Sequence, residues 1–317
     1  MKKILRLPSG VMRQSGFRAG IARGWRGPLL GLALLLAAPA AAFTPPDPAL
    51  LASTYQGGET FKYAVSWLGI PAGELEMSVE KNPEQPGQFL LRVTARTKGL
   101  LDVIYPVEDR FVTVVDGDRR LPLRCFQDQQ ERGRLNKRLT IYDQQRRLVT
   151  YMKNDNPPEV YPVDGLVHNE FSAFFYMRSL RFAAGETPVV PTYADKKRHE
   201  VEVFVDNRET IPSSLMGDKA TFLVRPHLTF KGYYEKIGDP QVWLTDDRHR
   251  IPLLIKAKII IGSLTGRLVE YHGPLGSFRE APPSPQAQPQ PQSLAPGTTI
   301  STPDVTITIR GGDQPAP

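Results

Sequence analysis

The stretch that decides the fold is Glu59-Thr-Phe-Lys-Tyr-Ala-Val-Ser-Trp67, in which apolar and polar side chains alternate. Residues 68–73 turn the chain, and Leu75, Met77 and Val79 then continue the alternation. A period of two places every second side chain on the same face of a β-strand, so one face of this hairpin is buried and the other is wet. A long two-faced hairpin of this kind indicates a large antiparallel sheet around an apolar interior.

The same alternation recurs along the chain, with Gly, Pro, Asn and Asp between the runs, as is typical of an antiparallel meander. The further runs are 89–96, 201–205, 251–261 and 264–271. Two segments, 115–123 and 244–253, resemble each other as a strand, an acidic turn, a basic residue and then aliphatic-Pro-Leu. The likeness fits either an internal duplication or the general similarity of Asp-rich hairpin turns.

One segment, residues 168–181, has the pattern of a helix. Asn169 is a suitable cap, Glu170 favours the helix dipole, and Phe171, Phe174 and Phe175 give the helix an aromatic side. We therefore expect a mainly β protein with this one central α-helix. The strands form either one large curved antiparallel sheet or two fused half-barrels, residues 59–165 and 183–280.

Residues 1–42 have the organisation of a cleaved secretory signal peptide. Seven Lys and Arg residues and no acid precede an apolar run that begins at Pro28, and small residues at 40–42 offer a cleavage site before Phe43. A transmembrane anchor is the alternative, but such a span needs about 20 apolar residues and this run has about 15. The expected product is a soluble periplasmic protein of a bacterium, with no transmembrane segment after cleavage.

The rest of the chain divides by composition. Residues 43–58 predict an extended lead-in, 59–280 the β-rich domain, and 281–317 a Pro/Gln-rich disordered tail whose end, 305–310, either forms a short strand or hangs free. Removing residues 1–42 leaves 33 basic and 33 acidic residues. Because the remaining chain is formally neutral, it lacks the basic excess that nucleic-acid binding requires. The single cysteine, Cys125, alternates with apolar residues and predicts a buried strand thiol.

Several stretches together resemble the family of secreted bacterial proteins known as domain of unknown function 3108, over about residues 58–272. The resemblance implies a cell-envelope location and a mostly antiparallel β fold, and it brings no activity. Asn169 departs from the pattern, since an acidic residue is more usual there. A looser similarity is to periplasmic lipoprotein-carrier half-barrels, in which a curved sheet wraps a helix and holds acyl chains. The stretches that carry the family resemblance are 61–74, 99–105, 109–110, 171–178, 242–247 and 250–263.

Aromatic side chains of the first strand and the helix are the candidate ligand-binding residues. They either fill the core or line an apolar pocket, since a curved sheet closed by one helix is a common way to hold a lipophilic molecule. The set consists of Tyr63, Trp67, Phe171, Phe174 and Phe175.

Arg178 is the candidate polar anchor, because it falls on the same helical stripe as Phe171. A buried guanidinium needs an acidic or carbonyl partner, and Asp109 or Glu108 is the expected one. The pair is either a structural ion pair or an anchor for the carboxylate or phosphate of a ligand.

The sequence shows no catalytic motif, metal-ligand spacing or phosphate-binding loop, so we expect neither an enzyme nor a cofactor. The leading expectation is a noncatalytic periplasmic protein that binds or carries a lipid or another apolar envelope component. The alternative is a structural or interaction protein of the envelope that engages a protein partner through sheet edges or the C-terminal tail.

Overall fold

The computed structural model describes residues 43–183, 185–228, 239–259, 262–281, 299–302 and 305–308. The expected signal peptide lies outside the described residues, as does most of the expected disordered tail. No helix in the described ranges is both long and apolar enough to cross a membrane.

The described residues contain one 15-stranded antiparallel sheet, a separate two-stranded sheet and three short helices. In chain order the elements are α1 (Pro48–Thr54), β1 (Glu59–Trp67), β2 (Ile70–Lys81), β3 (Phe89–Thr97), α2 (Leu100–Ile104), β4 (Val107–Val115), β5 (Pro122–Glu131), β6 (Arg134–Asp143), β7 (Leu148–Lys153), β8 (Glu159–Pro162), α3 (Glu170–Met177), β9 (Val189–Ala194), β10 (Lys197–Ile211), β11 (Lys219–Leu228), β12 (Gln241–Thr245), β13 (Pro252–Lys258), β14 (Ser263–Gly273), β15 (Gly276–Arg279), β16 (Thr299–Thr302) and β17 (Val305–Thr308).

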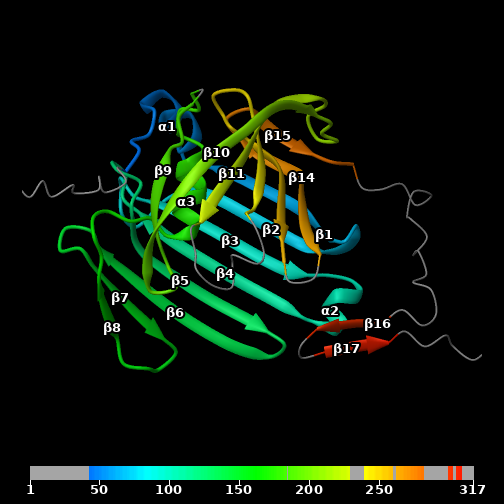
Figure 1. The fold of residues 1–317 in the computed structure, drawn as a ribbon, viewed down its shortest axis with the longest axis horizontal. Coiled ribbons are helices and arrows are strands. Elements are labelled where there is room, and N and C mark those ends of the chain that lie inside the picture. The colour runs from blue at the N-terminus through cyan, green and yellow to red at the C-terminus, as the bar shows by residue number, and fades with distance from the viewer. Residues whose placement is uncertain are drawn as a thin grey trace, which may run out of the picture. The chain divides into compact units, whose positions relative to one another are not determined.

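The large sheet is continuous, so of the two predicted arrangements the single sheet is the one found. Its strand order is β8-β7-β6-β5-β4-β3-β2-β1-β14-β13-β12-β11-β10-β9, with β15 paired to β14. The first strand joins the two halves of the chain, because β1 pairs with β2 on one side and with β14 on the other. The sheet curves around α3, which lies between β9–β11 and the strands β2–β4 (Figure 1). We call the face that packs on α3 the inner face.

The inner face carries the core. Phe61, Tyr63, Met77 and Val79 point inward from the first hairpin, as their alternation predicts, and pack with Phe175 of α3. A second cluster joins the other side of α3 to β9–β12, and a third lies around Cys125 and Tyr193. Because α3 contributes to the first two clusters, its burial holds the two halves of the sheet at their observed curvature.

Three details differ from the sequence expectations. The lead-in is not wholly extended, since Asp47 caps α1 by accepting from the amides of Ala49 and Leu50. The central helix is shorter than 168–181. After Met177 the chain tightens into two i→i−3 hydrogen bonds, which turn it out of the α-helical path. The strand expected over 251–261 ends at Lys258, with 260 and 261 outside the described residues. Of the two alternatives for 305–310, the short strand is found, as β17.

The two similar sequence segments form two similar hairpins, β4–β5 and β12–β13. Each has a register shift beside its turn and an arginine with positive φ before the aliphatic-Pro pair, Arg120 at 59° and Arg250 at 48°. Each guanidinium lies over a phenylalanine of the preceding strand, Phe89 at 4.3 Å and Phe222 at 4.1 Å from the ring centroid. The likeness therefore extends to side-chain packing as well as to turn residues.

The two end strands of the sheet, β8 and β9, are not joined by a β-ladder in the described part of the chain. Lys196, in the turn after β9, forms an ion pair with Glu159 at the start of β8, with a distance of 2.9 Å between Nζ and Oε2. The Lys196 ammonium also lies over the rings of Tyr151 and Tyr161. We call this set of side-chain contacts the seam.

Candidate functional site

A buried ion pair fixes α3 to the centre of the sheet. Arg178 has no exposed surface, and its guanidinium donates two hydrogen bonds to the carboxylate of Glu59, at 2.8 Å and 2.9 Å. It also donates to the backbone carbonyls of Arg250 and His249, at 3.0 Å and 2.9 Å. The hydroxyl of Tyr271 donates to the same carboxylate at 3.2 Å. Charge-assisted paired bonds of this type are strong and geometrically specific.

This saturation decides between the two predicted roles of Arg178. Four of the five N–H donors of a guanidinium are used within the protein, and the ring of Phe61 lies 4.9 Å from its carbon. A side chain so completely bonded has little capacity for a ligand. Arg178 therefore acts as a structural ion pair that ties α3 to β1.

The expected partner was wrong. Asp109 lies on β4 and accepts a hydrogen bond from the amide of Gln129 on the neighbouring strand β5, at 3.2 Å. Its other carboxylate oxygen is buried and has no hydrogen-bond partner among the described residues. Glu59 is the partner of Arg178 because β1 lies at the centre of the sheet, where the end of α3 meets it.

The five candidate aromatic residues separate into two groups. Tyr63 and Phe175 have no exposed surface, and the Tyr63 hydroxyl donates to the carbonyl of Pro252 at 2.8 Å, so both belong to the core. Phe171, Phe174 and Trp67 are only half-buried. The rings of Phe171 and Phe111 lie 4.5 Å apart, which joins the exposed side of α3 to β4.

The inner face changes character across the sheet. The backbone register places one row of side chains across eight strands, apolar from β14 to β4 and polar from β5 to β7. The apolar portion borders α3, and the polar portion faces the same interior. In order the row is Tyr271, Phe61, Met77, Val93, Phe111, Gln127, Arg138 and Lys153.

Arg138, like Lys153, is a polar residue of this row with free bonding capacity. Its only hydrogen bond in the described structure is a long one of 3.4 Å to the side-chain oxygen of Gln127, and its buried Nε has no partner. Neither a carboxylate within 4.0 Å nor an aromatic ring pairs with its guanidinium among the described residues. Arg138 thus has the open donors that Arg178 lacks.

Glu170, the first residue of α3, faces the same polar region. Desolvation by the surrounding protein raises the pKa of its carboxyl above the usual value, while the positive charge of Arg138 acts in the opposite direction. The side chain is nevertheless exposed to solvent. The first turn of α3 therefore places a solvent-accessible carboxyl near the guanidinium of Arg138.

The sequence interpretation missed Arg138, Gln127 and Glu170 as site residues. Residues 124–140 alternate between two polar sets, so hydrophobicity does not reveal which set points inward. The register with β4, which the structure supplies, identifies the inward set, because it places Gln127 opposite Phe111.

Other parts of the described structure are less suited to an apolar ligand. In the described residues no group of three or more His, Cys, Asp or Glu side chains is placed to hold a metal ion. A shallow hollow also lies on the outer face of the first hairpin, and its lining is polar. The lining residues are Thr60, Lys62, Glu76, Glu270, His272 and Arg279.

The comparisons with known proteins concern the family and the fold. A model of the family described as protein of unknown function DUF3108 matches residues 62–269. Curated protein sequences gave no match. Among solved structures, the chain is similar to a beta-barrel-like protein of the domain of unknown function DUF1849 from Brucella abortus, with a TM-score of 0.48 and 10% identity over 72% of this chain and 100% of that chain. Since the family model covers well over half of its length, the chain belongs to the DUF3108 family of proteins of unknown function.

Proposed function

We propose that this protein is a noncatalytic, exported periplasmic protein that binds or carries a lipid or another apolar component of the cell envelope. The ligand lies on the inner face of the sheet, with its apolar part against the half-buried rings of Phe171, Phe174 and Phe111. Its polar end lies towards β5 and β6, next to Arg138.

This proposal rests on one observation: the apolar side of α3 is only partly buried. A helix that only fills a core has its apolar side fully covered, as Phe175 is. Phe171 and Phe174 remain partly accessible to solvent, although they pack against the core. The neighbouring Glu170 is exposed to solvent. Half-buried apolar rings beside the exposed Glu170 and the guanidinium of Arg138 are the combination expected of a site for an amphiphile.

The energetics need no special motif. Each buried CH₂ contributes about 0.8 kcal/mol, so an acyl chain of about 14 carbons gains roughly 10 kcal/mol on leaving water. Part of this gain is lost to ordering of the ligand, and a few polar contacts are enough to fix its orientation. A binding protein of this kind therefore requires only a shaped apolar surface.

Native mass spectrometry of the exported chain, purified without detergent, tests the proposal. We expect a stoichiometric lipid that is identified after solvent extraction, and rebinding after delipidation. Phe171→Ala combined with Phe174→Ala reduces rebinding at least tenfold, whereas Phe126→Ala does not, because Phe126 lies on the outer face and is 43% exposed. A lipid-free mass that stays unchanged in total envelope lipids would refute the proposal and favour a protein partner.

The polar end of the site has its own comparison. We expect Arg138→Gln to weaken binding of a C14 fatty acid at neutral pH about tenfold or more, and to leave binding of the C14 alcohol unchanged. Lys137→Gln is the matched control, since Lys137 is the exposed neighbour on the opposite face of β6. If both substitutions weakened fatty-acid binding equally, Arg138 would not belong to the site. The proposal for the apolar part of the site would be unaffected.

A further inference from the structure

Exposed apolar side chains gather at one end of the large sheet. The antiparallel register brings the β1–β2 turn, α2, the β5–β6 turn and the β13–β14 turn to this end. The first three lie towards the right of the sheet in Figure 1. Six of the ten large apolar residues that are well exposed in the described chain lie here. We call these six the apolar rim: Leu68 (58% exposed), Ile70 (42%), Val103 (81%), Tyr105 (38%), Leu135 (51%) and Ile259 (36%).

Contacts between neighbouring turns make the rim continuous. The amide of Leu68 donates to the carbonyl of Ser263, which joins the β1–β2 turn to the start of β14. On the other side, α2 packs on β2. The hydroxyl of Tyr105 then donates to Glu131 at the end of β5, at 3.5 Å. The apolar tips therefore belong to one edge of the molecule rather than to unrelated loops.

Local folding does not explain why these residues are apolar. Turn positions usually carry Gly, Asn, Asp or Ser, which suit the backbone and the solvent. Leu68 has a φ of 50°, a left-handed conformation that favours Gly or Asn over a bulky side chain. A leucine that is strained and also more than half exposed lowers stability and solubility. Its presence is consistent with an apolar surface that is covered when the protein functions.

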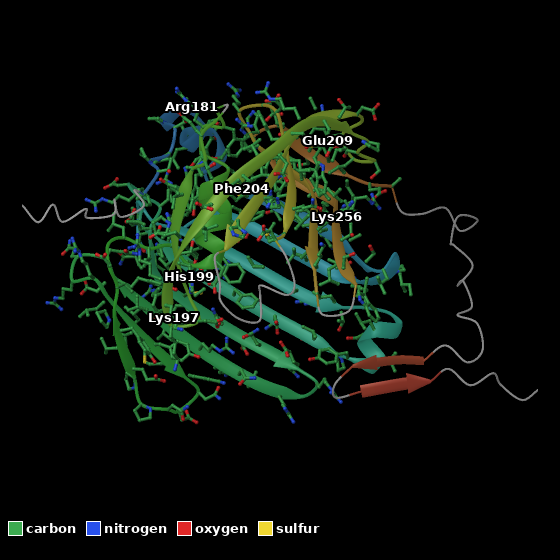
Figure 2. All side chains as sticks on the ribbon, in the orientation of Figure 1. Arg181, Lys197, His199, Phe204, Glu209 and Lys256 are labelled. Carbon is green, nitrogen blue, oxygen red and sulfur yellow. The ribbon has the colours of Figure 1, made fainter. Side chains whose placement is uncertain are left out.

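The charges beside the rim are mostly positive. Lys256, labelled in Figure 2, and Lys258 lie at the end of β13, just before Ile259. The guanidinium of Arg132 lies 5.6 Å from the ring of Tyr105. Asp102 and Glu131 are the acids of the same turns, and Glu74 of β2 forms an ion pair with Lys98. The formally neutral exported chain therefore carries a local cationic excess here. The cations of these turns are Lys98, Arg132, Arg134, Lys256 and Lys258.

We propose that the apolar rim docks onto the surface of a bilayer that contains anionic phospholipids. Separate apolar tips that project from several turns suit a yielding surface, into which each tip inserts between head groups. The flanking Lys and Arg residues meet the lipid phosphates, and each basic residue near an anionic surface adds to binding. An aromatic ring such as Tyr105 is favoured at the same depth. This inference does not depend on the ligand of the inner face.

Vesicle co-sedimentation tests the rim. We expect the exported chain to bind vesicles of phosphatidylglycerol and phosphatidylcholine at least tenfold more tightly than vesicles of phosphatidylcholine alone, and to lose this preference in 0.5 M salt. The combined variant Leu68→Ser, Ile70→Ser, Val103→Ser lowers binding at least tenfold. The matched control, Phe126→Ser with Ile141→Ser, removes apolar residues of similar exposure from the outer face and leaves binding unchanged.

A second variant keeps the test decisive if the first one folds poorly. Arg134→Glu with Lys256→Glu and Lys258→Glu retains every apolar tip and is expected to lose the preference for phosphatidylglycerol. Absence of wild-type binding to anionic vesicles, or equal losses in the rim variant and the Phe126–Ile141 control, would overturn the inference. Native mass spectrometry with a single-chain lipid distinguishes this failure from failure of the inner-face proposal, because rim substitutions do not touch that site.

Discussion

Arg178 and Glu59 are 119 residues apart in the sequence and meet through two hydrogen bonds in the core, between the end of α3 and the start of β1. The other guanidinium bonds go to backbone carbonyls of the turn before β13. Three elements that are distant in the chain are thus fixed by one side chain. Such a buried pair specifies an arrangement, whatever its net contribution to stability.

Removal of the Glu59 charge should strongly destabilise the fold, because it leaves the Arg178 charge buried without its counterion. We expect Glu59→Gln to lower the free energy of unfolding by about 3–5 kcal/mol, measured by urea denaturation. Glu80→Gln, which breaks the exposed pair with Arg92, should change it by less than about 1 kcal/mol. The double variant Glu59→Leu, Arg178→Met should recover part of the loss. Similar losses for the Glu59 and Glu80 variants would contradict the structural role.

The stability of the protein should decrease in acid because of His168. Burial lowers the pKa of this histidine from 6.5 to about 3, so the folded state favours the neutral ring. The unfolded chain binds the proton more readily below pH 6.5. The His168 contribution is therefore present above pH 6.5 and is lost as the pH falls towards 3, by up to about 1.4 kcal/mol per pH unit.

His168→Gln should flatten this part of the stability–pH curve, as measured by urea midpoints between pH 4 and pH 8. His272→Gln is the control, since His272 is exposed and its substitution leaves the buried ring in place. An unchanged slope in the His168 variant would show that other groups govern the acid sensitivity.

Two glycines that flank Val65 should differ in their tolerance of a side chain. A Cβ on Gly73 of β2 would lie 2.1 Å from the carbonyl oxygen of Arg96, a backbone atom that cannot move aside without distorting β3. On Gly266 of β14 the nearest heavy atom would be 3.7 Å away. We expect Gly73→Ala to cost about 1–3 kcal/mol and Gly266→Ala much less, by thermal denaturation. The reverse order would mean that β2 and β3 are spaced differently from the structure described.

Cys125 should be unreactive in the folded protein. Burial raises the pKa of its thiol to about 11, and its sulfur is bonded only to neighbouring polar groups of the core. Since the thiolate is the reactive species, labelling by a disulfide reagent at pH 8 should be slow in buffer and rapid in urea. Fast labelling under native conditions would show that the cluster around Cys125 opens readily.

The parts of the fold that the sequence predicts are those with a local physical signal. Alternation of Phe61, Tyr63 and Val65 assigns the buried face of β1, and Asn169 marks the start of α3 through its capping box. The partner of Arg178 has no such signal. It depends on which strand lies at the centre of the sheet, which is a property of the topology.

The sequence did not reveal the polar half of the inner face for a related reason. Between Arg124 and Thr140 both faces of the hairpin are polar, so the pattern that distinguishes the inside from the outside is missing. The short helix α1 did have a signal, the cap Asp47 followed by a proline, but it lies in a Pro-rich stretch that favours an extended interpretation.

The seam has a mechanical consequence. In a closed barrel the circumference is fixed, because backbone hydrogen bonds run around the whole ring and a change of girth must break a ladder. Here β8 and β9 are joined by the ion pair of Lys196 and Glu159 and by ring contacts, and a single backbone bridge between His168 and Thr192 ties β9 to the chain before α3. Between β8 and β9 themselves, no ladder in the described residues fixes the circumference. The circumference of the sheet is thus set by this bridge and by side-chain contacts, among them the buried pair of Tyr142 and Tyr193, instead of by a closed ladder.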